Sequence, residues 1–556
     1  MARLDRLAPV KEIGQIGAAI GREFSYPLLH VLVQRDATAL NNALGQLEQA
    51  GLVFRRGEPP EAIYSFKHSL VRDAAYESLL KSRRQQLHSQ IARALDEKFS
   101  DVAASQPEIV AHHFTEAGLA ETAIDYWLKA GQQAARRSAN TEALNHLARG
   151  LELLPDIHDP MLRNKSELLL QTSLGNCLRA TKGWSTDNVK HAYTRALQLC
   201  KESGFEEHAL PAAFGLWTWH FVHATLGEAQ SLAEQLVNTS QNVNDSVYRV
   251  LAHEALGFTL FARGNFAAAH AALEHSIRMC EDSKAAAYLD LSAQDPRVHV
   301  RVYDGMVLWL LGYPDQALRI CAEAHSYAYA SQHPFSEALA RTISLRVHQF
   351  RGEVGVVAAQ ANVAIALCEE HDFAHYLAMA LILRGWANAQ QGEFEKGISE
   401  IQKGLEKERG TGALLYESYT LGLMADACLK NERYRQAFEF LHQAQLRLKQ
   451  ENSERFYAAE IYRLLGETYL RSQEDLDHAE HYLSEGLKIA REQKAKSLEL
   501  KLCVSIYDLY ELRQNADKCR SQLGKIYETF SEGFETMDLL RAKARLRILD
   551  SNRVSS

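Results

Sequence analysis

The 556-residue sequence has no apolar run long enough to cross a membrane, and its first residues, Met-Ala-Arg-Leu-Asp, lack the hydrophobic core of a signal peptide. It also has no Cys-x-x-Cys pair. Its eight cysteines are dispersed, mostly on apolar faces of expected helices, as is typical of reduced thiols packed in a core. These absences argue against a membrane-spanning chain, and we expect a cytoplasmic protein without a membrane partner.

The sequence also lacks a strong excess of either charge. It has 62 Lys and Arg residues against 70 Asp and Glu residues, a formal net charge of −8. This balance excludes a nucleic-acid footprint spread over the whole surface. The length exceeds that of one ordinary globular core, so we expect a repeat structure accompanied by a smaller domain.

One arrangement of small residues recurs along most of the chain. It is clearest after Leu256, where Gly257, Gly264, Ala269 and Ser276 follow one another at offsets of 7, 5 and 7. The small or β-branched marker of the second helix recurs at spacings of 40, 48, 40, 40, 40 and 42, at Ala229, Ala269, Ala317, Val357, Gly397, Ala437 and Ala479. A period near 40 also suits HEAT or armadillo repeats, but the small residue in the first helix favours long tetratricopeptide (TPR) units.

The repeats predict a mainly all-α fold, a TPR-type solenoid over residues 107–530. Each unit has an apolar face that it buries only by stacking on its neighbours, and the stack offers an extended concave surface. A helical connector is expected at residues 81–106. Residues 531–556 are expected to form a C-terminal capping helix and tail.

The N-terminal residues show a different pattern. Residues 10–50 carry helical periodicity in three pieces, and residues 52–56 and 63–67 then predict two short strands around a Gly-Glu-Pro-Pro turn. Three helices followed by a β-hairpin is the order of a winged helix. We therefore expect a small winged-helix domain at residues 1–80.

Several segments together resemble one known family. The chain is similar to the C-terminal winged-helix and TPR region of bacterial multidomain proteins that join a class III adenylate or guanylate cyclase, a STAND-type AAA-like ATPase and TPR repeats. The segments that carry the resemblance include residues 19–24 (AIGREF), 64–79 (YSFKHSLVRDAAYESL), 111–118 (AHHFTEAG), 123–131 (AIDYWLKAG), 311–318 (LGYPDQAL) and 495–500 (AKSLEL).

The chain departs from that family in its catalytic parts. It has no GxxxxGK[ST] loop, whose amides and lysine would hold a nucleotide, and no cyclase domain with metal-binding carboxylates. We therefore expect no catalytic residues, no cofactor and no metal site, and hence no enzyme. In an intact parent protein the resemblance implies a nucleotide-sensor role for His68, and the alternative is a histidine at a strand end that bonds to the backbone.

Two further groups of polar residues have simpler interpretations. Arg55, Arg56 and the basic cluster at residues 81–84 could contact DNA phosphates, but the resemblance implies that the winged helix is a spacer, so DNA is not an expected partner. His112 and His113 with Glu116 suggest metal ligands, yet adjacent helical residues point about 100° apart. Structural packing is the expected role of both histidines.

The repeats offer a binding surface instead. Positions at offsets −3, +1 and +4 from the small residue of each first helix are expected to face the groove. They place large apolar side chains there, at Phe214, Phe221, Phe258, Phe261, Met306, Trp309 and Trp386. Such anchors suit a peptide or ligand groove. The alternative is that 40-residue repeats bury these side chains against neighbouring helices.

The expected function is that of a non-catalytic sensor and protein-interaction module that regulates upstream ATPase or nucleotide cyclase domains. A protein, a peptide or a small-molecule ligand would occupy the TPR groove. The alternative is a transcriptional regulator with a DNA-binding winged helix and inducer-binding repeats.

Overall fold

The computed structural model describes residues 10–553 except 34, 138, 183–185, 206–208, 242, 244–245, 281–287, 289–293 and 473–474. Residues 1–9 of the expected N-terminal domain and 554–556 of the expected tail lie outside this range. The chain divides into unit 1, Met1–Cys177 with Gln198–Gly204, and unit 2, Leu178–Leu197 with Phe205–Ser556. Within the described residues, three short strands form one sheet and nearly all other elements are helices.

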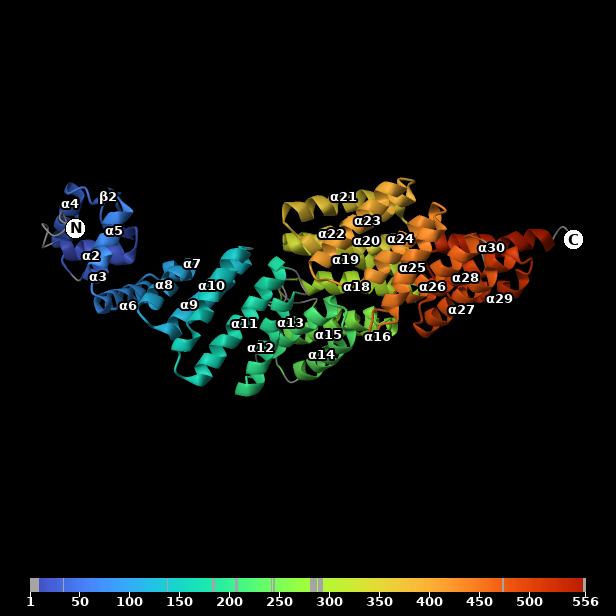
Figure 1. Cartoon of the computed structure of the whole chain (residues 1–556), viewed down its shortest axis with the longest axis horizontal. Helices are drawn as coiled ribbons and strands as arrows, with labels where there is room; N and C mark the ends of the chain where they lie inside the picture. The colour runs from blue at the N-terminus through green and yellow to red at the C-terminus, as the bar shows by residue number, and fades with distance from the viewer. Residues whose placement is uncertain are drawn as a thin grey trace. The chain divides into compact units, whose positions relative to one another are not determined.

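Unit 1 begins with the three helices and the hairpin expected from the sequence, together with one further short strand (Figure 1). Its elements are α2 (Lys11–Ile20), β1 (Glu23–Ser25), α3 (Tyr26–Val33), α4 (Ala37–Gln49), β2 (Val53–Arg56), β3 (Ile63–Phe66), α5 (Ser69–Glu77), α6 (Lys81–Lys98), α7 (Ser100–Ser105), α8 (Pro107–Glu116), α9 (Ala120–Arg136), α10 (Asn140–Glu152), the 3-10 helix η1 (Leu154–Asp156), α11 (Pro160–Lys182) and α12 (Asp187–Ser203). Helices α11 and α12 supply residues to both units.

The small sheet has a strand that the sequence pattern missed. Strand β1 pairs antiparallel with β3, Glu23 opposite Ser65, and β2 pairs antiparallel with the other edge of β3, Val53 opposite Phe66. The three residues of β1 are too few to show an alternating pattern. The predicted order of three helices and a hairpin is confirmed, whereas membership of the winged-helix class stays a prediction.

One core joins the sheet region to the first repeat helices. Phe24, Tyr64 and Phe66 of the sheet are buried in the same cluster as Ile91 of α6 and Trp127 of α9. Helix α6 packs on α2, α3 and α8. The predicted connector at residues 81–106 is helical and lies inside this core, and the predicted domain limits stay predictions.

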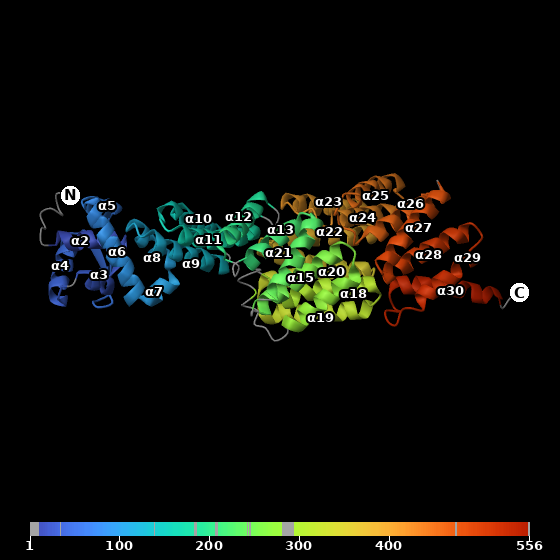
Figure 2. The ribbon, with the colours of Figure 1, turned by 90° about the horizontal axis from the view of Figure 1, so that it is seen from below.

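Unit 2 is a succession of packed helices (Figures 1 and 2). They are α13 (Ala209–Val222), α14 (Leu226–Ser240), α15 (Ser246–Ala262), α16 (Phe266–Cys280), α18 (Pro296–Leu311), α19 (Pro314–Ser331), α20 (Pro334–Phe350), α21 (Val354–Glu370), α22 (Ala374–Gln390), α23 (Phe394–Gly410), α24 (Glu417–Lys430), α25 (Tyr434–Leu448), α26 (Ala458–Ser472), α27 (Leu476–Glu492), α28 (Lys496–Leu512), α29 (Asp517–Tyr527) and α30 (Met537–Arg553).

The small residues of the repeat pattern lie where paired helices touch. A Cβ atom added to Gly257 of α15 would lie 2.6 Å from the Leu273 side chain of α16. One added to Gly385 of α22 would lie 2.6 Å from the backbone oxygen of Gly397 in α23. The prediction that small residues let two helices approach closely is confirmed, and with it the TPR-type solenoid.

Unit 2 also brings distant repeats into contact. The amides of Leu414 and Leu415 donate to the carbonyl of Val222 at the end of α13, at 3.0 and 3.1 Å. One repeat later along the chain, the amides of Arg455 and Phe456 donate to the carbonyl of Ala262 at the end of α15, at 2.7 and 3.2 Å. The later repeats therefore pack on the earlier ones, and the surface between them is buried inside unit 2.

The C-terminal helix α30 packs on α28 and α29, as Figure 2 shows near the C-terminus. Leu539 and Ala542 are buried in this contact, and Arg545 forms an ion pair with Asp508 at 2.6 Å. All eight cysteine side chains of the chain are buried. Within the described residues, no helix has the length and apolar character needed to span a bilayer.

Candidate functional site

The interior of unit 2 contains a small pocket with a cavity volume of about 50 Å³, which we call the chamber. Helices α11, α13, α15, α18, α20 and α22 and the turns before α18 and α24 all contribute to its wall. The lining residues are Arg179, Phe214, Trp217, Thr218, Phe221, Val222, Glu254, Phe258, Gln294, His299, Tyr303, Ile343, His375, Tyr376, Met379 and Tyr416.

One side of the chamber is aromatic. The Trp217 ring lies 5.2 Å from both the Phe214 and Phe221 rings of the same helix, and 6.4 Å from the Phe258 ring of α15. The indole nitrogen of Trp217 donates to the Thr259 hydroxyl at 2.9 Å, so its polar atom is satisfied within the wall. This side therefore offers mainly ring faces and edges to a ligand.

The other side of the chamber is polar and hydrogen-bonded. His299 Nδ1 lies 2.8 Å from Oε1 of Glu254, a carboxylate that is 1% exposed. Nε2 of Gln294 donates to the Tyr376 hydroxyl at 3.4 Å. The first contact joins α15 to α18, and the second joins the turn before α18 to α22.

Burial controls the protonation of the chamber's tyrosines and of His375. It raises the pKa of the Tyr303, Tyr376 and Tyr416 hydroxyls, which therefore stay neutral. Burial, followed by the nearby charges of Arg346 and His299, lowers the pKa of His375 to about 4. These four groups can exchange hydrogen bonds with a ligand without carrying charge at neutral pH.

A buried cation, Arg346, lies against the Tyr416 ring but is not itself part of the chamber lining. The Arg346 guanidinium lies 4.1 Å from the centroid of the Tyr416 ring, and its Nε and Nη1 atoms are buried with no hydrogen-bond partner among the described residues. Burial raises the pKa of the nearby Glu408 carboxyl to about 8, although Arg346 opposes this shift. Burial also raises the pKa of Glu454, against its hydrogen bonds to Tyr416 and Ser418.

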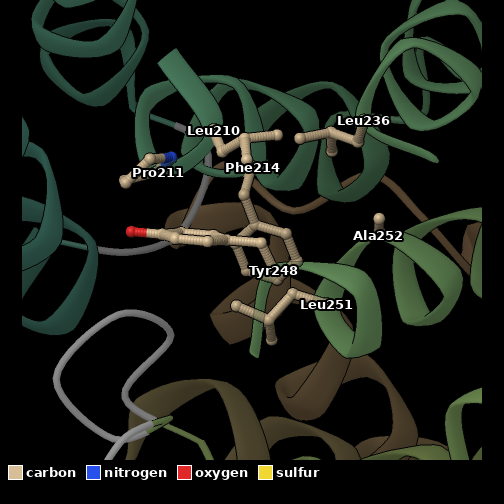
Figure 3. A pocket seen from close by; sticks show the side chains of 7 residues that line it. All are labelled: Leu210, Pro211, Phe214, Leu236, Tyr248, Leu251 and Ala252. Atoms are coloured by element: carbon tan, nitrogen blue, oxygen red, sulfur yellow. The ribbon is translucent and has the colours of Figure 1, made fainter. Parts of the chain in front are cut away.

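A second, apolar pocket with a cavity volume of about 10 Å³ adjoins the aromatic side (Figure 3). It is lined by Leu210, Pro211, Phe214, Leu236, Tyr248, Leu251 and Ala252. Figure 3 shows the Phe214 ring pointing between Tyr248 and Leu251. Because Phe214 lines both pockets, the position of its ring determines how far the chamber extends in this direction.

The predicted groove residues fall into two sets. Phe214, Phe221 and Phe258 line the chamber. The other four are buried between helices and are absent from its lining: Phe261 lies 5.0 Å from the Phe456 ring, Trp309 lies 4.9 Å from the Phe350 ring, the Trp386 indole donates to Asp426 at 3.0 Å, and Met306 is fully buried. The role of all seven as a ligand groove stays a prediction.

The sequence pattern missed most of the polar lining. Glu254, His299 and His375 precede the small residues Gly257, Gly305 and Gly385 of their helices by 3, 6 and 10 positions, so no single offset identifies them. Residue type gave no clear signal either, because the same helices carry other titratable side chains, such as Arg249, Asp304 and Arg384.

The N-terminal candidates belong to unit 1, whereas the chamber residues belong to unit 2. His68 is the N-cap residue of α5, its side chain is exposed, and it makes no side-chain cap hydrogen bond. Arg55 forms ion pairs with Glu48 at 3.7 Å and Glu58 at 3.1 Å. Helix α4, which precedes the hairpin, contains no Lys or Arg.

Of the two adjacent histidines, His113 belongs to a buried, hydrogen-bonded group, whereas His112 is exposed. Nδ1 of His113 lies 2.8 Å from Nδ1 of His88, and Nε2 of His88 lies 2.8 Å from the Tyr76 hydroxyl. Among the described residues, no three His, Cys, Asp or Glu side chains are grouped so that they could hold a metal ion. His113 is buried as the packing interpretation expects.

Comparison with known sequences finds one distant curated relative. No protein-family model matches the chain. A protein of Rhizobium meliloti (strain 1021), described only as uncharacterized, is 24% identical over 509 residues, which are 89% of this chain and 48% of that protein. The chain thus spans about half the length of the curated relative that it matches.

Solved structures with a similar arrangement of helices share little sequence. A Pyrococcus horikoshii STAND protein with a tetratricopeptide repeat sensor, PH0952, has a TM-score of 0.48 at 12% identity, over 79% of this chain and 62% of that one. A Rap protein complexed with competence and sporulation factor has a TM-score of 0.42 at 13% identity, over 73% and 98%. NprR with its cognate peptide NprX has a TM-score of 0.39 at 12% identity, over 62% and 98%. Similarity at this level does not extend to ligands or activities.

Proposed function

We propose that this chain is a non-catalytic sensor and interaction module that regulates a signalling ATPase or nucleotide cyclase. Unit 2 binds a ligand, a protein segment or a small molecule, and the occupied state is communicated to catalytic domains elsewhere in a longer protein. The observation that carries the proposal is the chamber. It is built from several successive repeats, and its lining combines aromatic, charged and hydrogen-bonding side chains.

The chamber's construction supports a sensor because its walls belong to different repeats. Glu254 of α15, His299 of α18 and Tyr376 of α22 come from three repeats, so a ligand that touches all three links the positions of their helices. A ligand shifts a conformational equilibrium only when it binds one arrangement better than another. In this proposal, a ligand that contacts several repeats meets that condition by binding one arrangement of their helices better than another.

Unit 1 supplies the proposed contact to a nucleotide domain. His68 is exposed at the junction of β3 and α5, where a second domain has access to its imidazole. We propose that His68 contacts the nucleotide in an intact parent, as the family resemblance implies. The partners in this proposal are the upstream ATPase or cyclase domains on one side and the chamber ligand on the other.

The test uses the R. meliloti relative, of which this chain matches about half. Deleting the matching segment from that protein should change its rate of ATP hydrolysis or cyclic-nucleotide synthesis by about fivefold or more, within the usual range of allosteric coupling. This chain alone should show neither activity above a buffer control. An unchanged rate after the deletion, a relative with neither activity, or turnover by the isolated chain that survives further purification would each contradict the proposal.

A further inference from the structure

We infer that a polar pocket at the ends of α15, α25 and α27 binds a sugar phosphate, that is, a phosphate ester that carries several hydroxyl groups. This polar pocket has a cavity volume of about 620 Å³. It shares no lining residue with the chamber. The inference therefore goes beyond the proposed function and does not depend on it.

Hydrogen bonds between repeats hold the walls of the polar pocket in place. The Arg455 amide donates to the carbonyl of Ala262, the last residue of α15, at 2.7 Å. Nε2 of Gln493, the residue after α27, donates to the Arg455 carbonyl at 2.7 Å. These bonds involve the backbone of Arg455, so they position its side chain at the pocket without using its guanidinium.

Three cationic side chains from separate segments line the polar pocket. Arg263 follows α15, Lys449 is the C-cap residue of α25, and Arg455 lies in the turn before α26. Among the described residues, none of these three side chains has an ion-pair partner. A guanidinium binds a phosphate through parallel hydrogen bonds, and an ammonium binds it as a point charge.

The dipoles of the helices account for only part of this positive charge. Arg263 and Lys449 follow the last turns of α15 and α25, where a cation is favoured. Arg455 instead precedes the first turn of α26, and its carbonyl accepts from the amide of Ala458 at 3.1 Å. A helix dipole disfavours a cation at that end. A bound anion, by contrast, is favoured there and offsets the charge of Arg455.

The remaining polar lining suits hydroxyl groups. Glu451 and Glu492 are exposed carboxylates, which accept hydrogen bonds and donate none, and Asn452 and Ser453 can do both. Oε1 of Gln493 is buried and has no hydrogen-bond partner among the described residues. These acceptors need donors, and the hydroxyl groups of a sugar supply them.

The same lining excludes other classes of ligand. None of its described residues is aromatic, so it offers no ring on which a nucleobase could stack. The carboxylates of Glu451 and Glu492 offset two of the three positive charges, which disfavours a ligand with many negative charges. A hydrophilic molecule with one phosphate remains, and the cavity volume lies in the usual range for small-molecule sites.

The experiment measures binding to the full chain by calorimetry. The probes are glucose 6-phosphate and ribose 5-phosphate, and they are compared with glucose and with inorganic phosphate. We expect at least one sugar phosphate to bind roughly tenfold or more tightly than glucose or inorganic phosphate. The reason is that only the ester makes both the charge-assisted contacts and the hydroxyl contacts.

Arg263→Gln and Arg455→Gln should each weaken binding of the sugar phosphate by roughly tenfold, because each removes one cation from the lining. The matched control is Arg435→Gln in the first turn of α25, which makes the same change of charge at a side chain that is 94% exposed. It should leave the affinity unchanged. Circular dichroism and urea midpoints check that each variant folds, and if one does not, the comparison of probes in the unaltered chain still decides.

Three results would overturn the inference. They are no binding of either sugar phosphate at millimolar concentration, equally tight binding of inorganic phosphate, and unchanged affinity in both folded variants. A variant that is less stable but binds as the unaltered chain does would assign its cation to helix stabilisation alone. None of these results affects the comparison of nucleotide turnover in the longer relative, so this inference and the proposed function fail separately.

Discussion

In unit 1, a chain of hydrogen bonds among buried side chains joins α5, α6 and α8. Tyr76 contacts His88, and His88 contacts His113 through their two Nδ1 atoms at 2.8 Å. Only one of these two nitrogens can carry the shared proton while the other accepts. The pair is thus arranged for two neutral imidazoles, and the fold excludes their doubly protonated state.

The burial of His88 and His113 determines how the stability of unit 1 changes with pH. It lowers the pKa of His88 to about 4, with further lowering by His112 and Arg84, and it lowers the pKa of His113 to about 3, with further lowering by His88 and His112. The ordinary value is 6.5. Below pH 6.5 the unfolded chain therefore binds protons that the folded chain does not, so stability decreases as pH falls toward 4.

Replacing His113 should make unit 1 less sensitive to acid. Between pH 7 and pH 5 a histidine with these values contributes about 2 kcal/mol to the loss of unfolding free energy. His113→Asn should therefore lose about 2 kcal/mol less than the unaltered chain over that interval, although it starts less stable. Urea unfolding followed through Trp127, in α9 of unit 1, measures this difference.

The control is His68→Asn, because the His68 side chain is exposed. It should show the same pH dependence as the unaltered chain. If the unfolding free energy of His113→Asn depends on pH as strongly as that of the unaltered chain, carboxylates alone cause the acid sensitivity of unit 1.

At the scale of elements, the closest helix pairing in the repeats depends on two glycines. A Cβ at Gly385 of α22 would lie 2.6 Å from the Gly397 backbone oxygen, and a Cβ at Gly397 of α23 would lie 2.5 Å from the Gly385 backbone oxygen. Backbone atoms cannot rotate away as side chains can. The two helices must separate if either position gains a methyl group.

Gly385→Ala should therefore destabilise unit 2 by about 1–3 kcal/mol, the usual cost of overpacking. The matched control is Gly355→Ala in α21, where an added Cβ meets no atom within 4 Å. Because alanine favours helix over glycine, that control should be neutral or stabilising by up to about 1 kcal/mol. Urea midpoints from circular dichroism compare the two, and equal midpoints would show that α22 and α23 separate at little cost.

At the scale of the whole of unit 2, a side chain from the C-terminal segment caps α19 at Asp315, 217 residues earlier in the chain. Oε1 of Glu532 accepts from the amide of Asp315 at 2.9 Å, and Asp315 Oδ2 accepts from the amide of Gly533 at 2.9 Å. Glu532 also accepts from the amide of Gln316. A carboxylate at a helix N-terminus satisfies exposed amides and is favoured by the helix dipole.

Removing this cap should loosen the docking of the C-terminal segment on α19. Glu532→Ala should cost about 0.5–2 kcal/mol, as the loss of a cap does. Hydrogen exchange should speed up at the amides of Asp315 and Gln316 and in α30, with little change in α15. Glu535→Ala is the control because Glu535 is exposed in the same segment, and identical exchange in both variants would assign the docking to apolar contacts alone.

The sequence by itself determined the helices before the hairpin, the hairpin strands and the pairing of helices within repeats, but not strand β1. Gly257 and Leu273, or Gly385 and Gly397, lie within one repeat of each other, so a local pattern of small residues is sufficient to place them in contact. The predicted helices before the hairpin also match α2, α3 and α4 closely. These contacts follow from spacing along the chain, which a sequence displays directly.

Only the tertiary structure decided which of the aromatic residues line a chamber. Val222 receives hydrogen bonds from Leu414 and Leu415 because small rotations between repeats add up until later repeats return to earlier ones. The accumulated rotation brings Arg179, Glu254 and Tyr416 to one chamber. It also buries Phe261 against Phe456, outside the lining of the chamber. No single repeat encodes the total rotation, so the chamber could not be read from the pattern that predicted its helices.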